Sequence, residues 1–357
     1  MKRKKLFLLV FLLVLLGLIM IYSSSYIWAE YKYNDSLKYL KNQGFFFIIG
    51  IFLMIFVSKI NVDFYYKKAN KMLLVGFILL GLVLIPGLGT VRNGSQSWFN
   101  FGIFSLQPSE IMKIILLIFT SKYLANNQDN IKYTFKTIFP IFLVVIMAFF
   151  LIMLQPDFGS GVVLTMSIIG LLFASGADFS FFVKIGLLGL IGIIILIIIA
   201  PYRMARIVAF LNPWADPLGS GFQIIQSLYA IGPGGLFGKG LGNSIQKHFY
   251  LPEPQTDFIF AIICEELGFL GGALVVILFA LIIYQIISIA LNTDDLFKKY
   301  LAFGIGFQMA FQTSINLLVV IGLIPVTGVT LPFVSYGGSS LLVSMISIGI
   351  VLNIADR

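Results

Sequence analysis

The sequence predicts an all-α, polytopic membrane protein with about ten transmembrane helices, and three observations support this fold class. Of the 357 residues, 59% are hydrophobic and only 11% are charged. The mean hydropathy of +1.01 is far above the range of soluble proteins. Apolar runs long enough to cross a hydrocarbon core of about 30 Å recur along the chain. A disordered chain, a coiled coil and a soluble dinucleotide-binding enzyme are therefore excluded.

The predicted spans follow one another with no soluble domain between them, so residues 1–357 are expected to form a single integral membrane domain. The first span follows the basic segment 1–5 and is expected to be a retained signal anchor, because further spans follow it. Charges, prolines or glycine clusters bound each run. The expected spans are residues 6–22, 44–58, 72–86, 109–124, 138–154, 159–177, 181–200, 258–287, 300–324 and 335–354.

The distribution of basic residues predicts the orientation of these spans. The chain has 24 Lys and Arg against 15 Asp and Glu, a net charge of +9. With the N-terminus inside, 15 basic residues fall on the cytoplasmic side and 8 on the outer side, as the positive-inside rule requires. Both termini are therefore expected to be cytoplasmic. Topology explains the positive charge, and a nucleic-acid partner is not expected.

One segment interrupts the regular spacing of the spans. Residues 201–257, called the outer segment below, form an extracellular loop of 57 residues between the seventh and eighth spans. It is rich in glycine, proline and aromatic residues, with a glycine-rich stretch at 232–242. Long loops without a function are rare, so this segment is expected to contribute to the site.

Three acidic residues stand at the outer starts of spans, each shortly after a proline. They are Glu110, Asp157 and Asp257, and a fourth outward start follows Pro332. Proline and an acid in the first turn are typical of a helix N-terminus, so helix capping explains each acid taken alone, and Asp157 in particular. Four helix N-termini at one face would together suit an anion such as a phosphate. Only their convergence in space would make that a site.

Other intramembrane charges have structural and functional interpretations. Lys113 follows Glu110 by three residues, which predicts an ion pair that either braces a helix or lines a polar cavity. Glu265 and Glu266 are expected to pair with polar groups inside the bundle. A single cysteine and a single histidine exclude an intramolecular disulfide and a two-histidine zinc site. Any metal must therefore have oxygen ligands.

Asp257 is the strongest candidate for chemistry, because it stands where the outer segment meets the eighth span, at the depth of a lipid headgroup. A helix N-terminus lowers the pKa of a carboxyl group, whereas a general base acting on a sugar hydroxyl benefits from a raised pKa. Burial against neighbouring aromatic side chains such as Phe258 would offset the dipole. Arg206 could grip a diphosphate or lie at the headgroup interface, and Trp98 could belong to the interfacial aromatic belt.

Several motifs follow one another along nearly the whole chain. They are Asn93-Gly94-Ser95-Gln96-Ser97-Trp98-Phe99, Gln107-Pro108-Ser109-Glu110-Ile111-Met112-Lys113, Gln155-Pro156-Asp157-Phe158-Gly159-Ser160, Gly221-Phe222-Gln223-Ile224-Ile225-Gln226-Ser227, Leu251-Pro252-Glu253, Thr256-Asp257-Phe258-Ile259-Phe260 and Pro332-Phe333-Val334-Ser335-Tyr336-Gly337-Gly338-Ser339-Ser340. These motifs resemble those of the SEDS proteins (shape, elongation, division and sporulation), the family of RodA, FtsW and SpoVE, and the resemblance implies a location in the bacterial plasma membrane. Residues 230–235 and 246–247 are more similar to the FtsW and SpoVE branch.

The resemblance implies ten transmembrane helices and an inverting glycosyltransferase that polymerises lipid II, the undecaprenyl-diphosphate-linked disaccharide pentapeptide. It implies that Asp257 is the essential aspartate and that Glu110 and Lys113 are the conserved pair of the fourth helix. The expected partners are a class B penicillin-binding protein, which crosslinks the strands, and other membrane proteins of the division or elongation machinery. The candidate substrate-binding residues are Trp98, Gln107, Ser109, Glu110, Lys113, Asp157, Arg206, Gln226, Lys239, Glu253, Thr256, Ser335 and Gly337.

No cofactor is required by the sequence, because the lipid diphosphate already activates the sugar. A divalent cation, Mg²⁺ or Mn²⁺, held by Asp257 and nearby oxygens is one way to compensate the charge of the leaving diphosphate. Two other functions remain open: a transporter that flips lipid II, and a non-catalytic scaffold for a penicillin-binding protein. The polar motifs lie at outer helix starts rather than at the membrane midplane, which favours the polymerase over the flippase.

Overall fold

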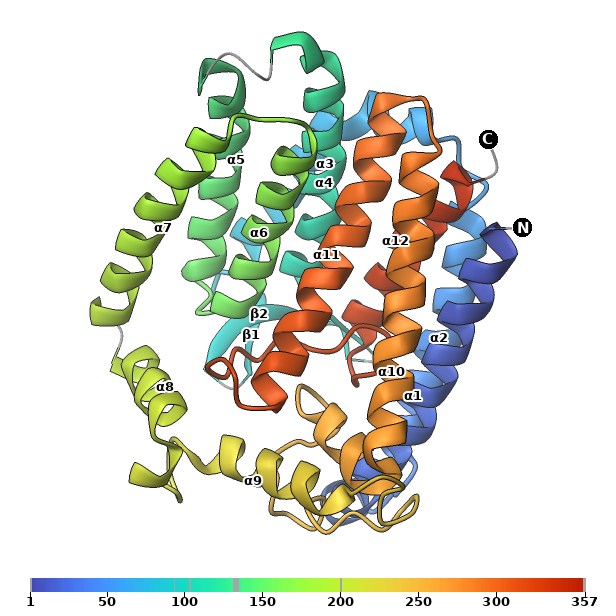
Figure 1. Ribbon diagram of the computed structural model, residues 1–357, viewed down its shortest axis with the longest axis vertical. Helices are drawn as coiled ribbons and strands as arrows, with labels where there is room; N and C mark the ends of the chain where they lie inside the picture. Colours follow the sequence, from blue (N-terminus) through green and yellow to red (C-terminus); the bar gives the residue numbers. More distant parts are fainter. Residues whose placement is uncertain (1, 93, 103, 131–134, 200, 356–357) are drawn as a thin grey trace.

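The computed structural model describes residues 2–92, 94–102, 104–130, 135–199 and 201–355 and is a bundle of roughly parallel helices (Figure 1). Three strands form a small sheet beside it. The helices, in chain order, are α1 (Lys2–Tyr33), α2 (Lys38–Val57), α3 (Val62–Leu82), α4 (Pro108–Asn126), α5 (Phe135–Met153), α6 (Phe158–Ala174), α7 (Phe179–Ile199), α8 (Pro201–Leu211), α9 (Phe222–Ile231), α10 (Ile259–Leu291), α11 (Leu296–Val320) and α12 (Gly338–Ile354).

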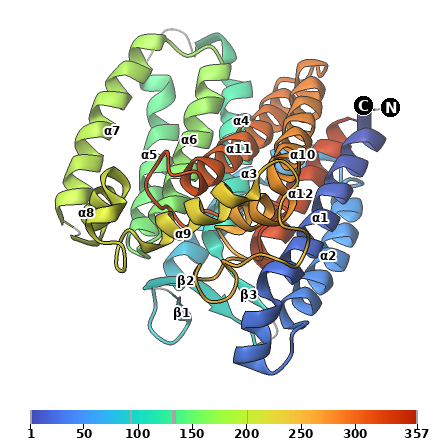
Figure 2. The same cartoon turned by 60° about the horizontal axis from the view of Figure 1, so that its bottom comes forward.

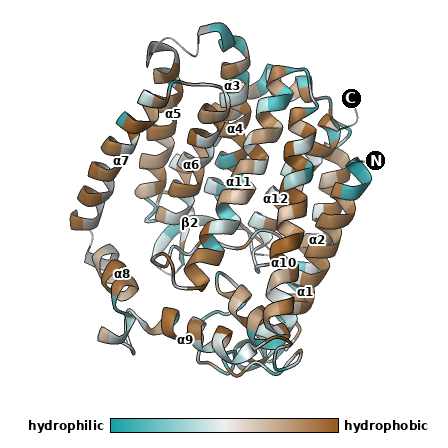
Figure 3. Cartoon of the chain, in the orientation of Figure 1, coloured by the Kyte–Doolittle hydropathy of each residue, from teal (hydrophilic) through white to brown (hydrophobic). Residues whose placement is uncertain are grey.

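Each expected span corresponds to one helix, namely α1 to α7 and α10 to α12. Among the described residues, α1, α2, α10 and α11 are long and apolar enough to cross a membrane, and α5, α6, α7 and α12 contain shorter apolar stretches. Hydrophobic residues cover the shafts of the helices, and hydrophilic residues gather at the two ends of the bundle (Figure 3). A helical membrane protein is thereby confirmed, whereas the count of ten spans stays a prediction.

The two chain ends lie on the same side of the bundle, and α8 and α9 lie at the opposite end (Figure 1). The outer segment is more ordered than a loop, because its first half folds into these two helices. Viewed from that end, α9 and the chain that follows it cross the face of the bundle (Figure 2). The outer segment thus covers the helix ends at which the acidic motifs stand.

A three-stranded antiparallel sheet interrupts the helices before α4. Its strands are β1 (Gly89–Arg92), β2 (Ser95–Asn100) and β3 (Ser105–Leu106), in that order across the sheet. No strands were expected here, because strands this short leave no apolar run of helical length in the sequence. The sheet ends two residues before α4 and so directs the chain into that helix.

Helix α11 lies at the centre of the packing and contacts α4, α6 and α10. Small residues permit the close approach: a Cβ at Gly304 of α11 would lie 2.8 Å from a methyl carbon of Leu117. Helix α7 stands apart at the edge of the bundle and has its main helix contact with α8 (Figures 1 and 2). The polar residues Gln312 and Asn316 of α11 are buried, so the polar face of this helix lies inside the bundle.

Candidate active site

The N-terminal ends of α4, α6, α10 and α12 are joined by hydrogen bonds. The Gln107 side-chain amide, before α4, donates to Asp157 Oδ2 before α6 at 2.8 Å, and the Gln107 backbone N–H donates to Ser339 Oγ of α12 at 3.3 Å. The Tyr336 N–H, before α12, donates to the Gln255 carbonyl before α10 at 2.8 Å. These four helix starts therefore converge in space, and their N–H dipoles favour negative charge in the same region.

Asp157 is the N-cap of α6. Its Oδ1 accepts from the Ser160 N–H at 3.2 Å, and its Oδ2 accepts from Gln107 and, at 3.4 Å, from Ser109 Oγ. Pro108 occupies the first turn of α4, where a backbone N–H would have no acceptor within the helix, so its missing N–H costs no hydrogen bond. Gln107, Ser109 and Asp157 thus form one cluster that ties α4 to α6.

Asp257 is half-buried, two residues before α10 begins. Burial raises the pKa of its carboxyl group, while a 3.0 Å hydrogen bond from Thr256 Oγ1 and the charge of Arg206 act to lower it. The negative charge of Glu253 raises the pKa further. Burial is the largest of these effects, so the carboxylate is a better proton acceptor than a solvated aspartate.

Arg206 borders a cavity of about 250 Å³ between α8, α9 and the chain after α11. Ser220, Gln223 and Val326 also line it, and the Arg206 guanidinium donates to the Val326 carbonyl at 3.1 Å. The Arg206 charge has the smallest effect of those that act on the Asp257 pKa, so the cavity wall lies within electrostatic range of the carboxylate. A guanidinium beside a cavity is suited to a phosphate group.

Glu110 and Lys113 form the ion pair expected from their spacing, with 2.8 Å between Lys113 Nζ and Glu110 Oε1. Both side chains are buried. The Lys113 ammonium also donates to Gln312 Oε1 of α11 at 3.0 Å, so the pair links α4 to α11. Glu110 lines a small cavity of about 20 Å³ together with Gln308, which is room for about one water molecule. The pair both braces the bundle and borders a polar cavity.

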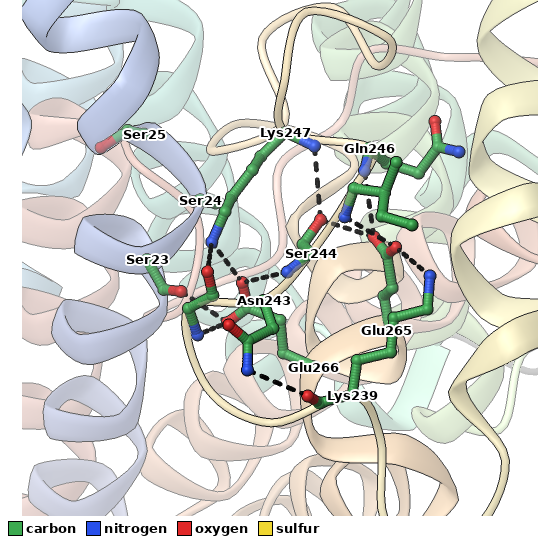
Figure 4. Close-up of polar contacts among 12 residues, drawn as sticks. Ser23, Ser24, Ser25, Lys239, Asn243, Ser244, Gln246, Lys247, Glu265 and Glu266 are labelled. Atoms are coloured by element: carbon green, nitrogen blue, oxygen red, sulfur yellow. Dashed lines mark hydrogen bonds and ion pairs between the residues drawn. The ribbon is translucent and has the colours of Figure 1, made fainter.

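A second buried network fixes the glycine-rich part of the outer segment to α10 (Figure 4). Lys239 pairs with Glu265 and Lys247 pairs with Glu266, each at 2.8 Å. Ser244 Oγ donates to Glu265 at 2.5 Å, and the two carboxylates also accept backbone N–H groups from residues 242 and 244–246. Lys239, a candidate substrate-binding residue, therefore has its ammonium group on a structural carboxylate.

The remaining candidates occupy different parts of the bundle end at which α8 and α9 lie. Trp98 is half-buried on β2, with the Arg92 guanidinium over its ring, and Gln226 is half-buried on α9. Ser335 accepts the Leu331 N–H at 2.9 Å. Glu253 is exposed and has a positive φ of 42°, a strained conformation for a non-glycine residue.

Four uncharged polar residues of the site were not singled out from the sequence: Gln43, Gln312, Asn316 and Ser339. Gln43 of α2 accepts the Gly337 N–H at 3.2 Å and donates to the Ser335 carbonyl at 3.3 Å, which holds the start of α12. Gln312 and Asn316 stand four residues apart on α11. The sequence pattern that indicates them was present, because amide side chains that repeat at helical spacing in an apolar span must face other polar groups.

Within the part of the chain that the structure describes, no group of three or more His, Cys, Asp or Glu side chains could hold an ion. Asp257 and Glu253 are two carboxylates in one region, and Mg²⁺ is commonly held by one or two carboxylates plus substrate phosphates. The donor set therefore fits a cation that arrives with a diphosphate.

Comparison with known proteins agrees with this architecture. The sequence model of the cell cycle protein family that groups FtsW, RodA and SpoVE matches residues 3–357. Stage V sporulation protein E of Bacillus subtilis (strain 168) is 52% identical over 96% of this chain and 94% of its own. A probable peptidoglycan glycosyltransferase FtsW of Coxiella burnetii is 41% identical over 96% of this chain and 93% of its own.

Two solved structures have the same fold. A chain from a peptidoglycan synthase complex, described for its coordination of polymerization and crosslinking, superposes with a TM-score of 0.80 at 29% identity, over 99% of this chain and 97% of its own. The rod shape determining protein RodA of Thermus thermophilus superposes with a TM-score of 0.72 at 26% identity, over 99% and 96%. The chain therefore belongs to the FtsW, RodA and SpoVE family of cell cycle proteins, as its motifs predicted.

Proposed function

We propose that this protein is a peptidoglycan glycosyltransferase that polymerises lipid II into glycan strands at the outer leaflet. The observation that carries the proposal is the half-buried carboxyl group of Asp257, whose pKa is raised by burial, in the same electrostatic environment as Arg206 and its cavity. The names of relatives support the reaction class, since FtsW proteins 41% and 38% identical to this chain are called probable peptidoglycan glycosyltransferases.

In the proposed reaction Asp257 is the general base. It accepts the proton of the 4-hydroxyl group of one lipid-linked sugar as that oxygen attacks the anomeric carbon of the other. The bond from the anomeric carbon to the diphosphate oxygen breaks, and polyprenyl diphosphate leaves with the bonding electrons. Arg206 and the converging helix N-termini stabilise the negative charge that develops on the diphosphate. Attack from the opposite face inverts the anomeric centre.

A divalent cation, Mg²⁺ or Mn²⁺, is proposed to bind with the diphosphate beside Asp257, held on the protein side by Glu253, because a carboxylate that coordinates a cation is a poorer base. It would neutralise charge on the leaving group. We also propose a class B penicillin-binding protein as the partner, by analogy with the peptidoglycan synthase complex that shares this fold. The site would face outside, because the outer segment lies at the end opposite the chain termini.

The interior of the bundle favours a polymerase over a flippase, because it offers no polar space large enough for a lipid headgroup in the part of the chain that the structure describes. The buried charges there are paired, and the cavity beside Glu110 has room for about one water rather than for a disaccharide headgroup. A scaffold function gives no reason for a carboxyl group whose pKa is raised by burial at the mouth of the site.

The test is to incubate the purified protein with labelled lipid II, with and without a catalytically dead penicillin-binding protein, and to measure product length. Glycan ladders that require the divalent cation are expected, with loss on chelation and return on addition of Mn²⁺. A flippase would instead move labelled lipid II across proteoliposomes without extending it. Absence of ladders with the partner and cations present would contradict the proposal.

A further inference from the structure

Helix α11 carries a stripe of amide side chains on the face that looks into the bundle. Gln308, Gln312 and Asn316 follow one another at intervals of four residues, and Gln312 and Asn316 are buried. Gln312 joins the Lys113 ammonium to the Thr330 carbonyl, with distances of 3.0 and 3.1 Å. The stripe therefore connects the core of the bundle to the chain that leads from α11 to α12.

Asn316 stands at the outer end of this stripe and contacts the backbone of Asp257. Its Nδ2 donates to the Asp257 carbonyl at 2.7 Å and to the Val329 carbonyl at 2.8 Å. Both neighbours are acceptors, so only the NH₂ side of the amide can face them and the orientation of the side chain is fixed. The two hydrogens of one NH₂ group thus clamp Asp257, two residues before α10, to the segment before α12.

We propose that Asn316 is a positioning residue for the proton transfer at Asp257, an inference that rests on the proposed glycosyltransferase function. The Asp257 carboxyl group is joined to its main chain through a single methylene carbon, so a shift of the main chain moves the base. A displacement of about 1 Å in a catalytic group can lower the rate about 100-fold. Within the described residues, the Asn316 amide donates to backbone carbonyls, and its effect on the reaction passes through Asp257.

A purely structural role would be the simpler explanation, and the chain offers a matched control for it. Asn353 of α12 is also buried, and its Nδ2 donates to the Ser58 carbonyl at 2.6 Å. In both asparagines Oδ1 is buried without a hydrogen-bond partner among the described residues. Asn353 lies near the end of α12, and its partner follows α2, so it is remote in sequence from Asp257. Removing either amide removes a buried hydrogen bond, but only Asn316 holds the base.

The experiment compares Asn316→Ala and Asn316→Ser with Asn353→Ala in the purified protein with its partner. Turnover and KM for lipid II are measured below the melting temperature of each variant. For Asn316→Ala we expect turnover to fall about 100-fold with KM near the wild-type value, the pattern of a transition-state defect. Asn316→Ser keeps one donor and should be intermediate. Asn353→Ala should lower the melting temperature and retain turnover.

Two outcomes would overturn the inference. One is that Asn316→Ala and Asn316→Ser both retain wild-type turnover. The other is that Asn353→Ala, at the same loss of melting temperature, loses turnover to the same extent. Failure of the proposed function has a different signature, because wild-type protein would then form no glycan ladder at all.

Discussion

At the scale of single residues, the chemistry depends on how Asp257 is buried. Burial raises the pKa of its carboxyl group above the usual value of 3.8, and the Thr256 hydroxyl hydrogen bond opposes that rise. A carboxyl group whose pKa is higher in the folded state than in the unfolded state stabilises the fold in its protonated form. That contribution to stability is present below the usual pKa and is lost as the pH rises through the raised pKa.

The pH dependence of the reaction follows from this balance. Activity should be lost as the pH falls through the raised pKa of Asp257, because the base becomes protonated. Thr256→Val removes the hydrogen bond that lowers the pKa, so the acidic limb of the rate profile should move to higher pH. Thr293→Val, whose hydroxyl bonds the Ile289 carbonyl at the far end of α10, should leave it unchanged. An acidic limb that moves down in Thr256→Val would contradict the assigned role of the hydroxyl.

The sequence was sufficient to select Asp257, Glu110 and Lys113, because charges inside an apolar span stand out and because the motifs resemble a known family. It was not sufficient for Asn316. Asn316 is uncharged, and its partner is 59 residues away in the chain, so only the folded structure shows what its amide holds. Lys239 was proposed for substrate, yet the fold places Glu265 against its ammonium group.

At the scale of elements, local sequence patterns predicted where helices start but did not predict the helices of the outer segment. Proline followed by an acid correctly indicated the starts of α4 and α6, and the structure confirms Asp157 as the cap of α6. Helices α8 and α9 and the three strands were missed, since each is shorter than a membrane span. The position of the glycine-rich stretch depends on Glu265 and Glu266, which follow it in sequence and accept hydrogen bonds from Lys239 and the Gly242 N–H.

The Lys247–Glu266 pair should therefore determine how stably the outer segment is held on α10. Lys247→Met leaves the Glu266 carboxylate buried without its cation and should destabilise the protein by about 3–5 kcal/mol. Lys41→Met removes the ammonium of an exposed pair with Asp35 and should have little effect on the melting temperature. The measurement is thermal unfolding in detergent. Equal melting temperatures for the two variants would mean that the buried network does not hold the outer segment.

At the scale of the whole molecule, composition predicted a helical membrane protein because backbone polar groups in lipid must be satisfied within helices. The charge distribution predicted that the two termini share a side, and the fold places them at the same end of the bundle. How far apart the acidic motifs lie in space could not be predicted, since helix packing depends on contacts between distant residues such as Gly304 and Leu117.

The orientation in the membrane can be tested by labelling in intact cells. In a Cys264→Ala background, Leu218→Cys places a thiol at an exposed position of the outer segment, and Asp294→Cys places one between α10 and α11 at the other end. A membrane-impermeant maleimide should label the first and should label the second only after the cells are opened. The reverse pattern would invert the predicted topology and place the site inside the cell.

The most direct test that Asp257 is the general base compares lipid II polymerisation by Asp257→Asn with that by Asp294→Asn. Asp294 is an exposed acidic residue remote from the site. We expect Asp257→Asn to lower the rate at least about 100-fold, the lower range for a general base. Its melting temperature should equal or exceed that of wild type, because the variant removes the cost of a desolvated carboxylate. Asp294→Asn should retain full activity. Glycan ladders of wild-type length and rate from Asp257→Asn would contradict the account.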